Sequence, residues 1–230
     1  MAANEGGTVE LFEVMRTTFA ARRFTETAID DGMIYRLLDN ARFASSGGNR
    51  QGWHVIVVRD AVTKRAIGDL AAPAAKRYAA QVNAGEQPWN TIDETALSDA
   101  AIEETPAPVG LTESLAGAPV VLVVCVDLKV VASTDRFLDR VGVISGGSIY
   151  PFAWNIQLAA RHEGLGTTIT TMPIAEEPQL QALLGIPSHV AVAALMPLGE
   201  PLRQLTKLRR KPVEEIATFE RYDGSPLTAP

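Results

Sequence analysis

Residues 119–126 read PVVLVVCV, a run of aliphatic residues and one cysteine with no polar position after the proline. A strand with one wet face alternates apolar and polar residues, so this run favours a strand that is buried on both faces. The run is far shorter than the roughly 20 residues that a membrane-spanning helix needs. A chain of 230 residues, 47% of them hydrophobic, is large enough to bury such a strand in one core.

The rest of the chain carries further strand and helix patterns. Residues 53–58 and 190–198 predict two more strands, and the Thr-rich residues 165–171 predict a strand or an extended segment. Helical spacing or helix-forming composition predicts helices over residues 9–18, 29–41, 61–82, 146–163 and 176–184. We find no internal repeat and no linker, so residues 1–230 are expected to form one α+β domain.

Two segments fit neither the helical nor the strand spacing of apolar residues. Residues 83–117 are too long for an ordinary connection, and we expect either a lid over a bound ligand or a surface excursion packed on a partner subunit. Residues 201–230 become basic and then polar, with no core signal of their own. We expect them to form an arm that docks on a partner subunit.

Charge and cysteine content narrow the class of protein. The net charge is −6, but residues 83–117 alone hold seven acidic residues and no Lys or Arg, so the remainder is close to neutral. No broad basic face is evident, which argues against a nucleic-acid partner. The single cysteine, Cys125, cannot form an internal disulfide, and the N-terminal residues lack the pattern of a secretory leader. A cytoplasmic protein without a membrane segment is expected.

Several common site signatures are missing from the sequence. It contains neither the glycine pattern of a dinucleotide-binding turn nor that of a phosphate-binding P-loop. The three histidines are scattered without ligand spacing, and no Gly-x-Ser-x-Gly turn is present. The sequence therefore supports neither a Rossmann site, a P-loop, a metal site nor a serine hydrolase.

Four polar segments remain, and each suits part of one ligand. Arg22 and Arg23 can hold a phosphate with forked hydrogen bonds, and the amides of Asn49 and Gln51 suit the edge of a heteroaromatic ring. Glycines and threonines in residues 164–172 allow close approach of backbone N–H groups, and residues 207–212 hold four cations. Taken singly, the segments also fit a solvated helix end, a turn, a strand and a solvated charge run.

The order of these segments resembles the nitroreductase family of flavoproteins over residues 17–216. The resemblance rests on the arginine pair, on SGGNRQGW at residues 46–53, on GLG before a Thr-rich strand and on the C-terminal basic cluster. It implies an α+β fold with a central, mostly antiparallel sheet flanked by helices, an intertwined homodimer and one FMN held at the interface. By position it assigns flavin contacts to Arg22, Arg23, Ser46, Gly47, Asn49, Gln51, Ile169, Thr170, Thr171 and Arg209 or Arg210.

The sequence also departs from the family pattern. Thr18, Phe19 and Ala20 stand where the family has Arg-Arg-Ser, so two phosphate ligands are missing. Arg23 and the doubled Arg209–Arg210 are candidates to replace them. Thr171 stands where a glutamate often lies beneath the flavin, which bears on substrate choice and redox potential.

The function implied by the resemblance is hydride transfer from NADH or NADPH, through FMN, to nitroaromatic or quinone acceptors in a ping-pong cycle. No catalytic side chain is expected, because the flavin carries the chemistry. We expect Trp89, Tyr150 and Phe152 to contact the acceptor. Other redox chemistry on the same fold, such as dehalogenation or enone reduction, and a flavin-binding protein with little turnover remain as alternatives.

Overall fold

A four-stranded sheet forms the middle layer of the computed structural model, which describes residues 10–229. The strands lie in the order β1-β2-β4-β3, and every adjacent pair is antiparallel. This arrangement confirms the expected α+β class and the antiparallel sheet. The strand bounds are β1 Trp53–Val58, β2 Val120–Asp127, β3 Gly166–Thr167 and β4 Val190–Gly199.

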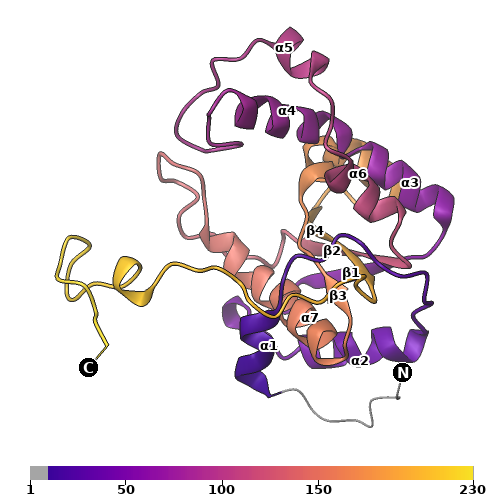
Figure 1. Cartoon of the computed structure of the whole chain (residues 1–230), viewed down its shortest axis with the longest axis horizontal. Coiled ribbons are helices and arrows are strands. Elements are labelled where there is room, and N and C mark those ends of the chain that lie inside the picture. Colours follow the sequence, from indigo (N-terminus) through magenta and orange to yellow (C-terminus); the bar gives the residue numbers. More distant parts are fainter. Residues whose placement is uncertain (1–9, 230) are drawn as a thin grey trace.

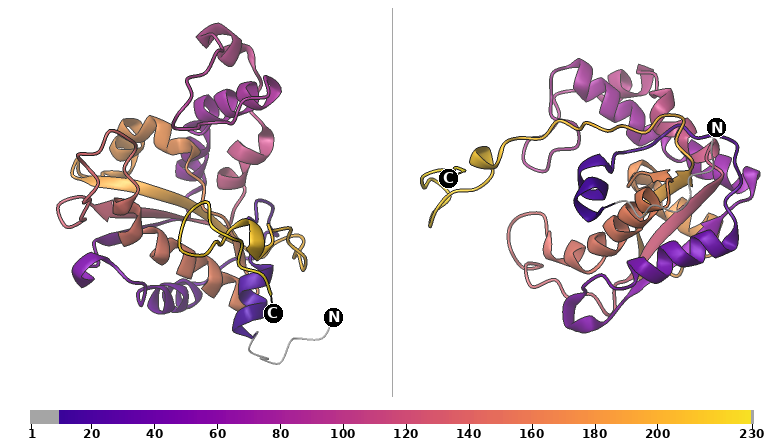
Figure 2. Two further views of the ribbon diagram at one scale, coloured as in Figure 1. Left: turned by 90° about the vertical axis from the view of Figure 1, so that its left-hand side faces the viewer. Right: turned by 60° about the horizontal axis from the view of Figure 1, so that its bottom comes forward.

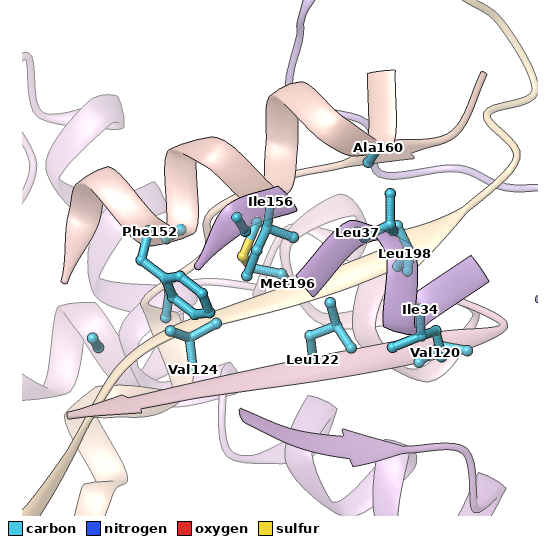
Figure 3. Packing of buried hydrophobic residues seen from close by; sticks show 14 of the residues in the cluster. Ile34, Leu37, Val120, Leu122, Val124, Phe152, Ile156, Ala160, Met196 and Leu198 are labelled. Atoms are coloured by element: carbon cyan, nitrogen blue, oxygen red, sulfur yellow. The ribbon is translucent and has the colours of Figure 1, made fainter. Parts of the chain in front are cut away.

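The run at β2 is buried on both faces, as its composition predicted. Its even-numbered residues pack against α2 (Asp31–Ala41) and α7 (Tyr150–His162), whereas its odd-numbered residues pack against α3 (Ala61–Asp69), α6 (Val109–Ala116) and α8 (Glu177–Leu184). Figure 3 shows the first of these cores, with Phe152 and Ile156 of α7 above Leu122 and Val124. Figure 1 shows α1, α2 and α7 on one side of the sheet and α3, α4 and α6 on the other.

Local signals in the sequence fix several helix ends. The Asp30 carboxylate accepts a hydrogen bond of 2.7 Å from the Met33 N–H and so caps α2. Asp60 caps α3 in the same way through the Thr63 N–H, also at 2.7 Å. Gly185 ends α8 in the left-handed conformation, with φ of 67°.

Some predicted boundaries are wrong. The helix expected over residues 61–82 is two helices, α3 and α4 (Ala72–Asn83), separated by a turn before Pro73. The helix expected from residue 146 begins at Tyr150, after the 3-10 turn η2 (Ile144–Ser148), with Pro151 in its first turn. Proline is favoured at the start of a helix because it lacks an N–H, and composition alone does not reveal the break.

The segment 83–117 is more ordered than its weak periodicity indicated. It contains α5 (Asp99–Glu104) and α6, and Leu115 of α6 is fully buried against α3 and β2. The Thr-rich segment is less regular than expected, since β3 holds two residues before an isolated bridge joins Thr170 to Leu195. Two short pieces complete the core region, α1 (Leu11–Thr17) and the 3-10 helix η3 (Met172–Glu176).

The C-terminal arm leaves the body of the molecule after β4. Figure 1 shows it, in yellow, running past α1 and projecting outward, and the second view in Figure 2 shows the same separation. The arm holds the 3-10 helix η4 (Val213–Glu215) and an antiparallel bridge between Thr218 and Pro226. The N-terminal residues expected to lack a leader, and Val9 of the expected first helix, lie outside the described residues.

Candidate active site

The β3 edge of the sheet brings three distant segments together. The Ala21 N–H donates to the Thr167 carbonyl at 3.1 Å, and the Leu202 N–H donates to the Arg23 carbonyl at 3.0 Å. Gly166 allows this approach, because a Cβ at that position would lie 2.7 Å from the Ala21 Cβ. The arginine pair, the Thr-rich segment and the start of the C-terminal arm therefore share one edge.

The arginine pair is exposed at this edge. Arg22 and Arg23 line a cavity of about 480 Å³ together with Phe24, Gly110 and Glu113. Within residues 10–229, neither guanidinium group forms an ion pair with a carboxylate. Both groups keep their donors available for an external anion.

The C-terminal cations lie in a different cavity of the same chain. Lys207 and Arg210 line a space of about 700 Å³ with Arg16 of α1, and the Gln204 side chain donates to the Thr17 carbonyl at 3.0 Å. Arg209 and Arg210 are exposed and, in the described part of the chain, have no carboxylate partner. The sequence motifs did not indicate Arg16. Its one signal in the sequence is that it lies two residues before Thr18, where the family's Arg-Arg-Ser motif begins.

Residues 46–51 form a tight loop held in an uncommon backbone conformation. Gly48, Asn49 and Gln51 have φ of 61°, 53° and 51°, which costs energy for the two residues that carry side chains. The Ser46 hydroxyl accepts from the Gln51 N–H at 3.0 Å, and the Gln51 amide donates to the Asn49 side-chain oxygen at 3.0 Å. The Gly47 N–H donates to the Ser148 hydroxyl at 3.2 Å. The loop therefore presents preorganised amide groups at the surface.

An aromatic cavity of about 600 Å³ adjoins the Thr-rich segment. Its walls include Tyr78, Trp89, Tyr150 and Thr171. Two of the three aromatic residues expected to contact an acceptor, Trp89 and Tyr150, thus meet beside an expected flavin contact. Tyr78 was not anticipated, although it is the single aromatic residue in the Ala-rich helix α4.

Trp89 is held firmly against α4. Its backbone N–H donates to the Gln81 side-chain oxygen at 3.1 Å, and its indole N–H donates to the Ala74 carbonyl at 3.3 Å. The Arg77 guanidinium lies 4.9 Å from the centre of the Trp89 ring. Gln81 in turn donates to Glu86 at 3.1 Å. Hydrogen bonds from the Thr95 hydroxyl, the Ala96 N–H and Gln81 lower the pKa of Glu86, so the Glu86 carboxylate that holds Gln81 is ionised at neutral pH.

Phe152 occupies a different place from the one expected. It is 3% exposed and stacks on Trp53 with ring centroids 4.8 Å apart and planes 3° apart. Within one chain its ring belongs to the core and supports Trp53, which lies two residues after the 46–51 loop.

The two sets of expected ring contacts lie on opposite edges of the sheet. Residues 46–51 precede β1 at one edge, whereas Thr170 bridges to β4 from the other. Strand spacing and the register Trp53–Val126–Ala191 separate Trp53 from Thr170 by roughly 14 Å across the sheet and roughly 13 Å along it. Among residues 10–229, no hydrogen bond joins the two sets, and the cavity that Gln51 lines is separate from the one that Thr171 lines. One flat ring cannot touch both in a single chain.

The described residues offer neither a metal cluster nor a membrane helix. Within residues 10–229, no three His, Cys, Asp or Glu side chains gather closely enough to hold a metal ion. Over the same range, no helix has the length and apolar character needed to cross a bilayer.

Comparison with known proteins defines the family. The fold matches an NADPH:FMN oxidoreductase from Vibrio harveyi solved with NAD⁺, with a TM-score of 0.67 at 19% identity, over 93% of this chain and 78% of the other. It also matches an iodotyrosine deiodinase solved with FMN and 3-iodo-L-tyrosine, with a TM-score of 0.64 at 20% identity, over 93% and 99%.

The sequence itself is 26% identical over 211 residues to a protein named NADH dehydrogenase from Thermus thermophilus, covering 86% of this chain and 90% of that protein. The sequence profile described as "Nitroreductase family" matches residues 15–200. The chain belongs to the Nitroreductase family.

Proposed function

We propose that this protein is an FMN-dependent oxidoreductase that passes a hydride from NADH or NADPH to nitroaromatic or quinone acceptors. The observation that carries the proposal is the aromatic cavity, in which Trp89 and Tyr150 face Thr171. The family and the names of its similar members support redox chemistry with flavin and nicotinamide.

The donors in this chain suit the parts of FMN. Arg22 and Arg23, with Arg209 or Arg210, would neutralise the phosphate, since their guanidinium groups have no carboxylate partner among residues 10–229. Ser46, Gly47, Asn49 and Gln51 offer hydroxyl, backbone and amide groups to the ring edge. Ile169, Thr170 and Thr171 would supply backbone contacts on the other side of the ring.

The residues of this chain bind and orient rather than react. FMN, when bound, would supply the redox chemistry, namely hydride transfer from the nicotinamide to the acceptor. Because the cavity lined by Tyr78, Trp89 and Tyr150 is one space, reductant and acceptor would occupy it in turn, which predicts ping-pong kinetics. N–H groups and cations near the ring would stabilise its added negative charge, and solvent would provide the proton.

We infer a homodimer, and the placement of the expected ring contacts supports it. Residues 46–51 of one chain and residues 169–171 of the other would hold each flavin, because one chain separates them across the sheet. The C-terminal arm, which projects from the body in Figure 1, would dock on the partner subunit. In the same arrangement, residues 83–117 would form one wall of the cavity, because Trp89 lines it.

Dehalogenation is the second candidate, and its support is the similarity in fold to the iodotyrosine deiodinase. The cavity lining favours the first candidate. None of its residues, Ala74, Tyr78, Pro88, Trp89, Tyr150, Thr171, Met172, Ile174, Ala175 and Val192, is an acid or a cation. The charged ends of an amino acid need ionic or hydrogen-bonding partners when they leave water, whereas a neutral flat ring does not. Neutral aromatic acceptors therefore suit this cavity better.

Stopped-flow reduction of the purified protein tests the proposal. We expect a yellow protein whose flavin absorbance bleaches anaerobically with NADH or NADPH and returns when a quinone is added. If the flavin absorbance returned faster with 3-iodotyrosine than with a quinone, dehalogenation would be favoured. A flavin that stays oxidised when NADH or NADPH is added would indicate a binding protein with little turnover. A colourless protein that takes up no FMN would contradict the proposal. A cytoplasmic location is part of it, since one buried thiol suits a reducing compartment.

A further inference from the structure

Asp135 is a buried carboxylate outside the cavities described above. It is 4% exposed and lies in the connection between β2 and α7. Its Oδ2 atom accepts from the Val143 N–H at 2.7 Å, from Arg140 Nη1 at 2.9 Å and from the Ile144 N–H at 3.3 Å. Its Oδ1 atom accepts from the Ser133 hydroxyl at 3.0 Å. Four donors thus converge on one side chain.

These contacts need an ionised carboxylate. The Val143 N–H, then the side chains of Arg140 and Ser133, lower the pKa of Asp135, so it is charged at neutral pH. A carboxylate accepts at both oxygens, whereas an asparagine would turn an NH₂ group toward one set of donors. An Asp135→Asn change therefore leaves donors unpaired in a buried site.

The turn that Asp135 holds is η2, because Val143 and Ile144 begin it. Two contacts lead from this turn toward the proposed active site. At its end, the Ser148 hydroxyl accepts from the Gly47 N–H at 3.2 Å. Within it, Gly146 lies against the Tyr150 ring, since a Cβ there would be 3.0 Å from Cδ2. Tyr150 itself donates to the Ala193 carbonyl at 3.2 Å and lines the aromatic cavity.

We propose that Asp135 is a positioning residue that fixes both the flavin-edge loop at residues 46–51 and the cavity residue Tyr150, acting through the turn Ile144–Ser148. The inference rests on the proposed function in one respect, namely that residues 46–51 contact FMN. Its structural part, that Asp135 orders Gly47 through Ser148, stands without a bound flavin.

Hydrogen exchange of the flavin-free protein tests the structural part. In Asp135→Asn, we expect the Gly47 amide to exchange about tenfold faster, the effect of losing roughly one hydrogen bond, while the Val123 amide in β2 keeps its protection. Asp139→Asn is the matched control, because it removes the same charge from an exposed position of the same connection and should change neither amide. Unchanged exchange at Gly47 in a folded Asp135→Asn protein would overturn the inference.

FMN titration by flavin fluorescence tests the functional part. Asp135→Asn and Ser148→Ala should each weaken FMN binding by about five- to tenfold. Because both substitutions act on Gly47, the double variant should bind FMN less than about twofold more weakly than Ser148→Ala does. A purely destabilising role would instead make the two effects multiply, and that result would count against the inference.

Two further outcomes have a defined meaning. If Asp135→Asn fails to fold, Arg140→Met removes one donor and leaves the carboxylate and its backbone contacts in place. It should then speed Gly47 exchange in the same direction, and no change there would reject the inference. If the unmodified protein binds no FMN, the proposed function fails, and the exchange measurement still decides the role of Asp135.

Discussion

Single residues at the β3 edge show how closely the backbone segments of the proposed phosphate site approach each other. Gly166 sits between Ala21 and Pro201, with both neighbours inside the space that a side chain would need. Cys125 lies in the middle of β2, where burial keeps its thiol from reacting. Each of these residues gives a direct test.

Gly166→Ala should destabilise the protein, because the new Cβ would meet the Ala21 Cβ at 2.7 Å and push the arginine segment from the sheet. We expect a loss of about 1–3 kcal/mol in the free energy of unfolding, measured by urea denaturation. Gly110→Ala is the control, since a Cβ at that position would have no atom within 4 Å and α6 should gain slightly. Equal stability of the Gly166 variant and the unmodified protein would show that the segments are not in contact.

The Cys125 thiol should be inert in the folded protein. Burial raises the pKa of this thiol to about 11, so almost no thiolate exists at pH 8, and the thiolate is the reactive form. A chromogenic disulfide reagent should label no thiol until denaturant is added and then one thiol per chain. Rapid labelling without denaturant would place Cys125 at the surface.

At the scale of elements, the segment between α4 and α5 carries the wall of the cavity. Trp89 is fixed by Gln81, Ala74 and Arg77, all from α4. This anchoring means that residues 83–117 contribute a defined surface to the site, beside η3 and the start of α7.

Trp89→Ala should raise KM for a quinone by about two- to tenfold, since an aromatic contact contributes about 0.5–1.5 kcal/mol. The KM for the nicotinamide should rise as well, because the reductant would occupy the same cavity in turn. Ile92→Ala, at an 85% exposed position of the same segment, is the control and should leave both KM values unchanged. An unchanged KM, with normal turnover, would remove Trp89 from the acceptor site.

Sequence patterns predicted these elements unevenly. The apolar run at β2 and the strand at β4 follow from short-range rules, and the structure confirms them. The break before Pro73 was not predicted, because an Ala-rich segment supports one helix as well as two. Tyr78 and Asp135 could not be found from a motif, since each gains its role from contacts with residues distant in the chain.

On the scale of the whole molecule, the strand order has the largest consequence. It places residues 46–51 and residues 169–171 on opposite edges of one sheet, with Arg22 beside the second set. The C-terminal arm extends beyond the body on its own (Figures 1 and 2). Both features fit a site that is completed by a second copy of the chain.

Complementation between two defective chains tests this claim most directly. One chain would carry Asn49→Ala and Gln51→Ala, and the other Arg22→Ala, so that each homodimer has two damaged sites. If each site combines the loop of one chain with Arg22 of the other, the isolated heterodimer has one intact site. It should then bind FMN to about half the capacity of the unmodified dimer, at unmodified affinity. If the heterodimer binds FMN no better than either parent, the site lies within single chains and the account is contradicted.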